Sequence, residues 1–306
     1  MLVFATSDKG GTGRSVTSSN VAYRGAMQGR DVCYLDFDFA SPTAGAIFNI
    51  PGVLRGTSKV GLHSYFLEDT IKDPERLNVW SESERMVLRD RPSGAGRLVL
   101  LPGDSGGGEF PVNPDMVQRC VRLFLRLEEE FDLCLVDLSA GRSYAIQMVL
   151  AATANQQLRS VTTRWLVFHR WTRQHIIAAS GLVNGDEGIL DSGVDRGHDR
   201  DALTDLIRFV RTAVVDPDSP ELAGLRPEQV AWLREVNRDL HKLASQYNLG
   251  RTVRLGSVPL DPVLQWREQL ISDEDTYASQ IANQETVDAF ETLAKRLMDD
   301  AAWRGL

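Results

Sequence analysis

The sequence predicts an α/β protein built on a mainly parallel, doubly wound sheet. Two observations predict this class: near-continuous apolar runs alternate with helical patterns along the 306 residues, and several of the runs end in glycine, proline or aspartate. Strands that are apolar on both sides belong to sheets that helices cover on both faces. Such sheets bind ligands outside the carboxyl ends of their strands, so the residues that follow each run form the candidate site.

The expected elements follow one another in a regular order. Residues 2–7 form a short β-rich run that stops at a glycine-rich turn, and residues 15–28, which lack proline, predict a helix after it. Further strands are expected at 31–38, 97–104, 131–141, 164–170, 206–215 and 251–261. Further helices are expected at 114–130, 171–183, 226–248 and from residue 283 to the end. We predict a single domain over residues 1–306, because one open sheet can reach this length.

Two stretches interrupt this alternation. Residues 52–96 have weak periodicity and several turn residues, which indicates a variable segment of helices and loops laid over the sheet edge. Residues 184–201 are rich in glycine and aspartate, and we expect a solvated, mobile loop there. A calcium site in that loop is disfavoured because the EF-hand spacing of acidic residues is absent.

The composition disfavours several classes of protein. No apolar run approaches the roughly 18 residues needed to span a bilayer, and the first residues lack the basic and long apolar regions of a signal peptide, so we expect a cytoplasmic protein. The cysteines Cys33, Cys120 and Cys134 are widely spaced, which favours reduced core residues over disulfides or metal ligands. The five histidines show no ligand spacing, so a transition-metal site is not expected.

The turn after the first strand carries a strong chemical signal. Residues 7–16, with the sequence SDKGGTGRSV, join the expected strand to the expected helix. Gly10, Gly11 and Gly13 let backbone N–H groups point at phosphate oxygens, and the helix N-terminus adds the positive end of its dipole. Ser15 places a hydroxyl where Mg²⁺ would sit, and the turn matches the end of the pattern G-x-x-x-x-G-K-[ST] except at the lysine, which is an arginine. A glycine-rich turn without a ligand is the alternative.

Acidic residues end the neighbouring strands. Asp36 and Asp38 end the second run, and Asp137 ends a very apolar run. Each of them alone is explained as a helix cap or turn residue. Because the carboxyl ends of parallel strands face one crevice, their placement together with the glycine-rich loop predicts a Mg-nucleotide site.

These stretches resemble the ParA/MinD family of ATPases. DKGGTGRS (8–15) is similar to the family's deviant Walker A motif K-G-G-x-G-K-[ST], LDFDFASPT (35–43) to its second-strand acidic motif, and LVDLSAG (135–141) to its Walker B and switch II segment. LGSVPLDPVLQWREQ (255–269) resembles the late strand and Pro-Asp loop of the same fold. The resemblance implies a P-loop NTPase fold of the SIMIBI type over nearly the whole chain, with ATP and Mg²⁺ as cofactors.

The resemblance also implies residue roles. Lys9 matches the signature lysine that reaches the partner's phosphates in an ATP-sandwiched dimer, and Asp38 matches the switch I acid that positions the attacking water. The implied catalytic residues are Lys9, Arg14 and Asp38, and the implied magnesium ligands are Ser15, Asp38 and Asp137. The implied nucleotide-binding residues are Lys9, Gly10, Gly11, Thr12, Gly13, Arg14, Ser15, Val16, Asp36, Gly141 and Pro259. Gly141 would be the switch II hinge, and Pro259 is a weak candidate for the base pocket.

Arg14 is the departure from the family pattern. It keeps the positive charge, but a planar guanidinium is larger than an ammonium and is not the same compact charge inside a phosphate cradle. We therefore expect a nucleotide-dependent, dimerising ATPase that positions or regulates a cellular component and hydrolyses ATP slowly. The alternatives are a non-hydrolysing ATP-binding scaffold, a phosphotransferase or amidoligase of the same fold, and a loop that no longer binds a ligand.

The resemblance implies partners as well. We expect an ATP-dependent homodimer and a protein partner that stimulates hydrolysis. The cysteines do not match the paired interface cysteines of nitrogenase-iron-protein relatives, so electron transfer is disfavoured. A membrane-targeting helix would use the stripe formed by Phe290, Leu293, Leu297 and Met298, but this stripe is more simply a last core-packing helix, although Trp303 keeps the membrane alternative open.

DNA binding is a further option for partners. The net charge of −8 argues against a surface-wide nucleic-acid footprint, but a local basic stripe is compatible with it. Arg251 with Arg254, or Arg164 with Arg170 and Arg173, are the candidate patches.

Overall fold

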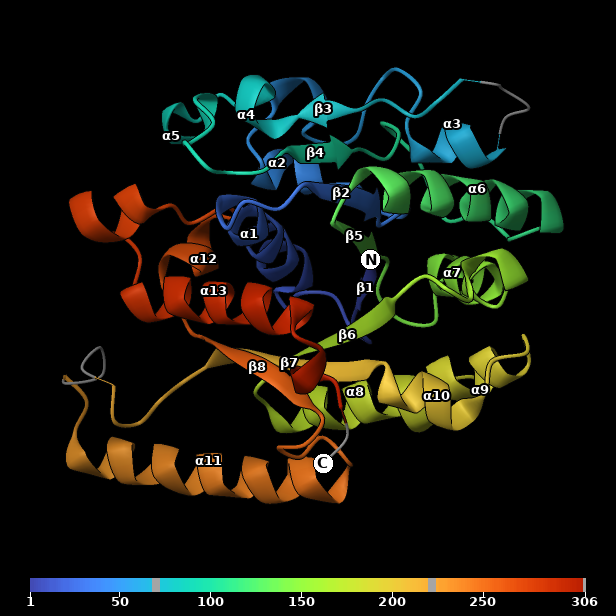
Figure 1. Cartoon of the computed structure of the whole chain (residues 1–306). Helices are drawn as coiled ribbons and strands as arrows, with labels where there is room; N and C mark the ends of the chain where they lie inside the picture. Colours follow the sequence, from blue (N-terminus) through green and yellow to red (C-terminus); the bar gives the residue numbers. More distant parts are fainter. Residues whose placement is uncertain (68–71, 220–223, 305–306) are drawn as a thin grey trace.

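The computed structural model describes residues 1–67, 72–219 and 224–304, and one eight-stranded sheet runs through it (Figure 1). The strand order is β3-β4-β2-β5-β1-β6-β7-β8. Neighbouring strands are parallel throughout except for the short edge pair β3 and β4. The strands are β1 (Leu2–Thr6), β2 (Val32–Phe37), β3 (Leu77–Asn78), β4 (Leu98–Leu101), β5 (Leu133–Leu138), β6 (Thr163–Arg170), β7 (Ile207–Val214) and β8 (Arg254–Pro259). The predicted fold class is confirmed.

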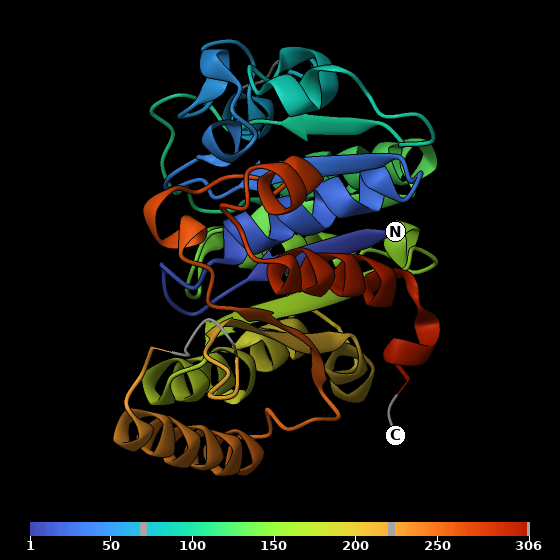
Figure 2. The ribbon, with the colours of Figure 1, turned by 90° about the vertical axis from the view of Figure 1, so that its left-hand side faces the viewer.

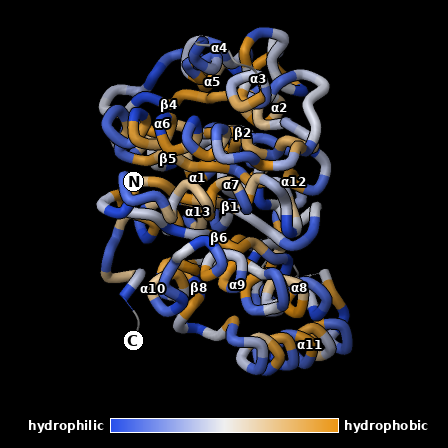
Figure 3. The backbone as a smooth tube through the Cα atoms, turned by 90° about the vertical axis from the view of Figure 1, so that its right-hand side faces the viewer, coloured by the Kyte–Doolittle hydropathy of each residue, from blue (hydrophilic) through white to orange (hydrophobic). Residues whose placement is uncertain are grey.

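Helices cover both faces of this sheet because its central strands are apolar on both sides. Leu2 and Phe4 of β1 pack into one buried cluster, whereas Val3 and Ala5 pack into the other. Figure 3 shows the hydrophobic segments gathered along the central strands. The helices are α1 (Arg14–Met27), α2 (Ala44–Ile47), α3 (Leu62–Leu67), α4 (Val79–Glu82), α5 (Met86–Arg89), α6 (Pro114–Glu130), α7 (Tyr144–Thr153), α8 (Arg173–Asn184), α9 (Ile189–Val194), α10 (Arg200–Asp205), α11 (Pro227–Gln246), α12 (Val263–Trp266) and α13 (Gln284–Met298).

The described residues also form single turns of other helix types. They are the 3-10 turns η1 (Pro51–Val53), η2 (Gln156–Leu158) and η5 (Asp300–Ala302) and the π-helical turn η4 (Glu274–Ala278). In the predicted segment 52–96, residues 68–71 lie outside the described residues. The described part has short helices and loops at the sheet edge, and it also supplies the edge strand β3.

The predicted mobile loop at 184–201 is wrong. This stretch contains helix α9 and the start of helix α10, and the side chains of Ile189 and Leu190 are buried. Asp199 accepts a hydrogen bond from the backbone of Ala202 and so caps α10. The glycines and aspartates that suggested a loop are helix caps and turns around a short apolar anchor.

The apolar stripe near the C-terminus belongs to the core. Phe290, Leu293 and Leu297 of α13 are buried, and α13 packs beside α1 and against β8 (Figure 2). Trp303 is 8% exposed, because Arg164 and Arg208 stack on its ring. No helix within the described ranges is both long and apolar enough to cross a bilayer.

The three cysteines are buried and not paired in disulfides. Burial raises the pKa of each thiol, because a thiolate in the core would lose its hydration. This environment agrees with the prediction of reduced core residues.

Candidate functional site

The glycine-rich loop joins β1 to α1 at the carboxyl end of the sheet. Gly11 and Gly13 have φ angles of 71° and 74°, a left-handed conformation that residues with a Cβ rarely adopt. The hydroxyl of Thr212 donates a hydrogen bond to the carbonyl of Thr12, and the N–H of Gly141 donates to the carbonyl of Ser7 at 2.8 Å. The loop is therefore fixed on both sides, by the end of β7 and by the segment after β5.

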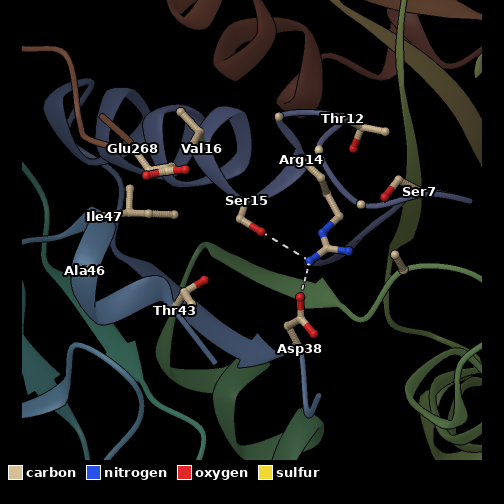
Figure 4. Close-up of a pocket in the computed structure, with 14 residues that line it drawn as sticks. Ser7, Thr12, Arg14, Ser15, Val16, Asp38, Thr43, Ala46, Ile47 and Glu268 are labelled. Atoms are coloured by element: carbon tan, nitrogen blue, oxygen red, sulfur yellow. Dashed lines mark hydrogen bonds and ion pairs between the residues drawn. The ribbon is translucent and has the colours of Figure 1, made fainter. Parts of the chain in front are cut away.

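A cavity of about 380 Å³ lies over this loop (Figure 4). Residues 10–16 form one wall of the cavity, and Asp38, Thr43 and Ile47 form another. Residues of the loop and the first residues of the 14-residue helix α1 line a space large enough for a phosphate group.

The side chain of Arg14 does not extend freely into this cavity. Its Nε lies 2.5 Å from Oδ1 of Asp137, and its Nη2 lies 2.8 Å from Oδ2 of Asp38 and 3.2 Å from Oγ of Ser15. Burial opposes the charge of the guanidinium, but the carboxylates of Asp137 and Asp38 outweigh that cost and raise the pKa of Arg14. Arg14 is consequently a fixed, permanently charged group.

Asp137 is held from a second direction by Tyr34 of β2. The hydroxyl of Tyr34 donates to Oδ2 of Asp137 at 2.9 Å, and both side chains are buried. The sequence analysis did not identify Tyr34, because a tyrosine within an apolar run looks like an ordinary core residue. Tyr34 and Asp36 are two residues apart in β2, so their side chains lie on the same face of the strand.

Asp36 supports the loop after β2 and does not line the cavity. Its carboxyl group accepts hydrogen bonds from the backbone N–H groups of Ala44 at 3.0 Å and Asp38 at 3.3 Å. Burial, together with the nearby charge of Asp137, raises the pKa of Asp36 to about 8. At neutral pH the protonated form of Asp36 therefore predominates, which lowers the negative charge behind the loop.

The other predicted site residues lie around the cavity in different ways. Gly10, Gly11, Thr12, Gly13, Ser15 and Val16 line it. Lys9 is exposed at the rim, and Gly141 lies behind the loop with a φ of 74°. Pro259 lies at a separate hollow between β8 and α13.

Glu268 is a cavity residue that the sequence analysis missed as a site residue. Its neighbour Gln269 accepts a hydrogen bond from Asn20 of α1 through its carbonyl at 3.0 Å, and the carbonyl of Ile271 accepts one from Arg24 at 2.9 Å. These contacts hold the segment along α1, so that Glu268 faces Val16 and Ile47 in Figure 4. The sequence offered one sign of this residue, because Glu268 is an acidic residue within the stretch 255–269 that resembles the Pro-Asp loop.

The predicted magnesium ligands do not fit the ion in this arrangement. Ser15, Asp38 and Asp137 are brought together as expected, but the guanidinium of Arg14 contacts an oxygen of each of them. A metal ion bound to the same oxygens would occupy the position of the guanidinium. Among the described residues, no group of three or more histidine, cysteine, aspartate or glutamate side chains is arranged to hold a metal.

One of the two predicted basic patches is wrong. Arg164 is 3% exposed, its Nη1 donates to the carbonyl of Leu297 and its Nη2 to Asp300. Arg164 and Arg170 lie near opposite ends of β6, about 20 Å apart at the usual rise of an extended strand, so they do not share one surface with Arg173. Arg254 begins β8 and so lies at the amino end of its strand, whereas the phosphate loop lies at the carboxyl end of β1; Arg251 is near Arg254.

No protein-family model and no curated protein sequence matches the chain. Solved structures share its fold. A plasmid partition protein from Borrelia burgdorferi, bound to AMPPNP, is 12% identical with a TM-score of 0.60, and the alignment covers 96% of both chains. The MinD cell division protein of Aquifex aeolicus is 15% identical with a TM-score of 0.56, covering 97% of this chain and 96% of that chain. The MinC:MinD complex of the same organism gives 15% identity, a TM-score of 0.55 and coverage of 97% and 95%. The chain thus has the P-loop NTPase fold of the MinD and plasmid partition proteins.

Proposed function

We propose that this chain is a nucleotide-dependent ATPase that positions or regulates another cellular component and hydrolyses ATP slowly. The observation that carries the proposal is the rigid glycine-rich loop at the N-terminus of α1, beside a cation held by two strand-end carboxylates. Two proteins with the same fold act in cell division and plasmid partition, and one of them holds AMPPNP.

The loop residues would perform the binding step. Backbone N–H groups of residues 10–13 donate to phosphate oxygens, and Arg14 supplies positive charge next to the γ-phosphate. Asp38, which lies at the cavity wall, would orient the attacking water. Because Arg14 is tied to Asp38 and Asp137, it cannot follow the charge that develops on the phosphoryl group as a flexible lysine can, and the slow rate follows from this.

Lys9 is the residue proposed to couple nucleotide binding to dimerisation. It is exposed at the rim of the loop and is not among the residues that line the cavity. An exposed lysine in this place can contact phosphate oxygens bound to a second copy of the chain. ATP would then stabilise the homodimer by mass action.

Sedimentation velocity and calorimetry test this function together. We expect wild type to bind ATP and to shift toward the dimer with a slowly hydrolysed ATP analogue, whereas Lys9→Ala should bind and remain monomeric. We also expect Arg14→Lys to raise turnover by up to roughly 10²–10³ and Asp38→Ala to abolish it. Absence of heat with ATP, ADP, GTP and GDP would contradict nucleotide binding, and an unchanged mass would contradict the dimer.

A non-hydrolysing scaffold is the second candidate, and one contact favours it. Asp38, the proposed water-positioning group, already accepts a hydrogen bond from Arg14 at 2.8 Å. If that contact persists with ATP bound, Asp38 has less freedom to orient water. Turnover indistinguishable from buffer, together with tight ATP binding, would identify the scaffold.

Two further experiments address partners. A partner that stimulates hydrolysis would be sought by capture on the nucleotide-locked form, and salt-sensitive DNA retention would test the remaining patch at Arg251 and Arg254.

A further inference from the structure

The donor groups of Arg14 are divided between two directions. A guanidinium has five N–H donors in a fixed plane. The Nε of Arg14 donates to Asp137, and its Nη2 donates to Asp38 and Ser15. Its Nη1 donates to no residue of the described chain, which leaves two N–H groups on one side of the fork.

The orientation of this fork matters because the side chain lies at the wall of the cavity. Arg14 lines the cavity together with Gly11 and Gly13, although only 6% of its surface is exposed. Figure 4 shows Nη2 directed at Ser15 and Asp38 while the other terminal nitrogen is turned away from them. Two acidic side chains thus fix the guanidinium, and its remaining donors are left for an anion bound by the loop.

We propose that the guanidinium of Arg14 takes the place of the divalent cation, so that the loop binds a nucleoside di- or triphosphate without a metal. The inference rests on the proposed nucleotide binding. The same hydroxyl and two carboxylates that would hold a metal hold a positive charge that belongs to the chain. Nη1 then contacts a terminal phosphate oxygen, as a bound metal ion would.

An arginine is suited to this position and a lysine is not. The planar fork reaches Asp137 through one nitrogen and Asp38 through another, whereas an ammonium presents its three donors from a single atom. The guanidinium also stays charged in a buried site, where a lysine can lose its proton.

Titration calorimetry of ADP and ATP, each in EDTA and in excess Mg²⁺, tests the inference. For wild type we expect the dissociation constants in the two conditions to differ by less than about threefold. For Arg14→Lys we expect binding at least about tenfold tighter with Mg²⁺, because the shorter side chain leaves the carboxylates open to the ion. Arg159→Lys is the matched control and should behave as wild type, because Arg159 is exposed and precedes the amino end of β6, whereas the loop lies at the carboxyl ends of the strands.

The outcomes separate the inference from the proposed function. Wild-type binding that is about tenfold or more tighter with Mg²⁺ would overturn the metal-free site while leaving nucleotide binding intact. That result would mean that Arg14 leaves Asp38 and Asp137 when nucleotide enters. Wild type that binds no nucleotide in either condition would overturn the proposed function and this inference with it. The wild-type comparison does not depend on how well the Arg14→Lys variant folds.

Discussion

Helix α1 carries a buried arginine near each end, and the two differ in what holds them. Arg14 begins the helix, and its guanidinium lies between two carboxylates at the wall of a cavity. Arg24 lies in the last turn, where it donates to the carbonyl of Ile271 and pairs with Asp273 and Glu291. Both side chains are almost fully buried, so burial alone does not separate a site from a structural contact.

The dipole of helix α1 affects the two arginines in opposite ways. A cation in the last turn of a helix is stabilised by the negative end of the dipole, whereas a cation in the first turn meets the positive end. The position of Arg24 is therefore favourable in itself, and its contacts with Ile271 and Asp273 hold that segment against α1. The position of Arg14 is unfavourable unless anions surround it, and the carboxylates of Asp38 and Asp137 supply that negative charge.

Replacing Arg24 by methionine should have the largest effect on folding. The variant loses the hydrogen bond to Ile271, the pair with Asp273 and the cation–π contact with Tyr23, whose ring centroid lies 5.2 Å from the guanidinium. We expect a loss of about 2–4 kcal/mol in the free energy of unfolding, measured with urea. Nucleotide affinity should change by less than about tenfold, since Arg24 does not line the cavity.

Arg159→Met is the control for this substitution, because Arg159 is exposed and should cost no more than about 0.5 kcal/mol. An Arg24→Met variant as stable as the control would show that the contacts of Arg24 with Ile271 and Asp273 add nothing to the free energy of unfolding. A loss of nucleotide binding at full stability would instead make Arg24 part of the site.

The same substitution at Arg14 should mainly affect binding. Arg14→Met removes the charge-assisted donors and leaves Asp38 and Asp137 facing the phosphates. We expect ATP affinity in EDTA to fall roughly 100-fold, which corresponds to about 2.7 kcal/mol. Calorimetry measures this, and circular dichroism confirms that the variant is folded. Affinity within threefold of wild type would remove Arg14 from the binding site.

The sequence predicted seven of the eight described strands, all except the short edge strand β3, and it predicted the glycine-rich loop, because these elements depend on local pattern. Helix α6 begins and ends where its periodicity predicted, and Gly13, Ser15 and Asp137 were placed by their positions after apolar runs. Helix α9 was missed because six residues are too few for a helical period to stand out among glycines and aspartates. Its two buried apolar residues were the only local sign.

Long-range contacts were out of reach of the sequence. The reach of Arg14 to Asp137 spans 123 residues, and the contacts that bring the segment beside Glu268 onto α1 span 249. Spacing places residues at the ends of strands, but it does not say which side chain points at which. The contact of one guanidinium with three expected magnesium ligands therefore emerged only from the structure.

The buried acid behind the loop should make stability depend on pH. The pKa of Asp36 is about 8 in the folded protein against 3.8 for an ordinary aspartate, so the folded state holds a proton that the unfolded state has released. The associated stability is fully present below pH 3.8 and is lost as the pH rises toward 8. Within this window the free energy of unfolding should fall by at most about 1.4 kcal/mol per pH unit.

Asp36→Asn tests the source of that slope, because an amide cannot ionise. Urea unfolding of wild type and variant across the same pH range should give a flatter profile for the variant. Parallel profiles would assign the slope to other groups. A wild-type free energy of unfolding that does not decline between about pH 5 and 8 would mean that Asp36 is ionised in the folded protein throughout this range.

The smallest expected effect lies at the second contact of Asp137. Tyr34→Phe removes the hydroxyl that donates to Oδ2 of Asp137 but keeps the ring against Phe48, with centroids 5.3 Å apart. We expect a loss of about 1 kcal/mol in the free energy of unfolding, because one oxygen of a buried carboxylate loses its donor and the hydroxyl of Ser18, 3.1 Å away, loses a partner. Arg14 still holds Oδ1, so ATP affinity should stay within about threefold.

Tyr23→Phe is the matched control, since the hydroxyl of Tyr23 makes no hydrogen bond to the described residues. Equal unfolding free energies for the two variants would mean that Tyr34 does not hold Asp137. A large loss of ATP affinity in Tyr34→Phe would mean that Asp137 needs both of its contacts to keep the guanidinium in place. In that case Tyr34 would belong to the binding site together with Arg14, because the position of the guanidinium would depend on the hydroxyl of Tyr34.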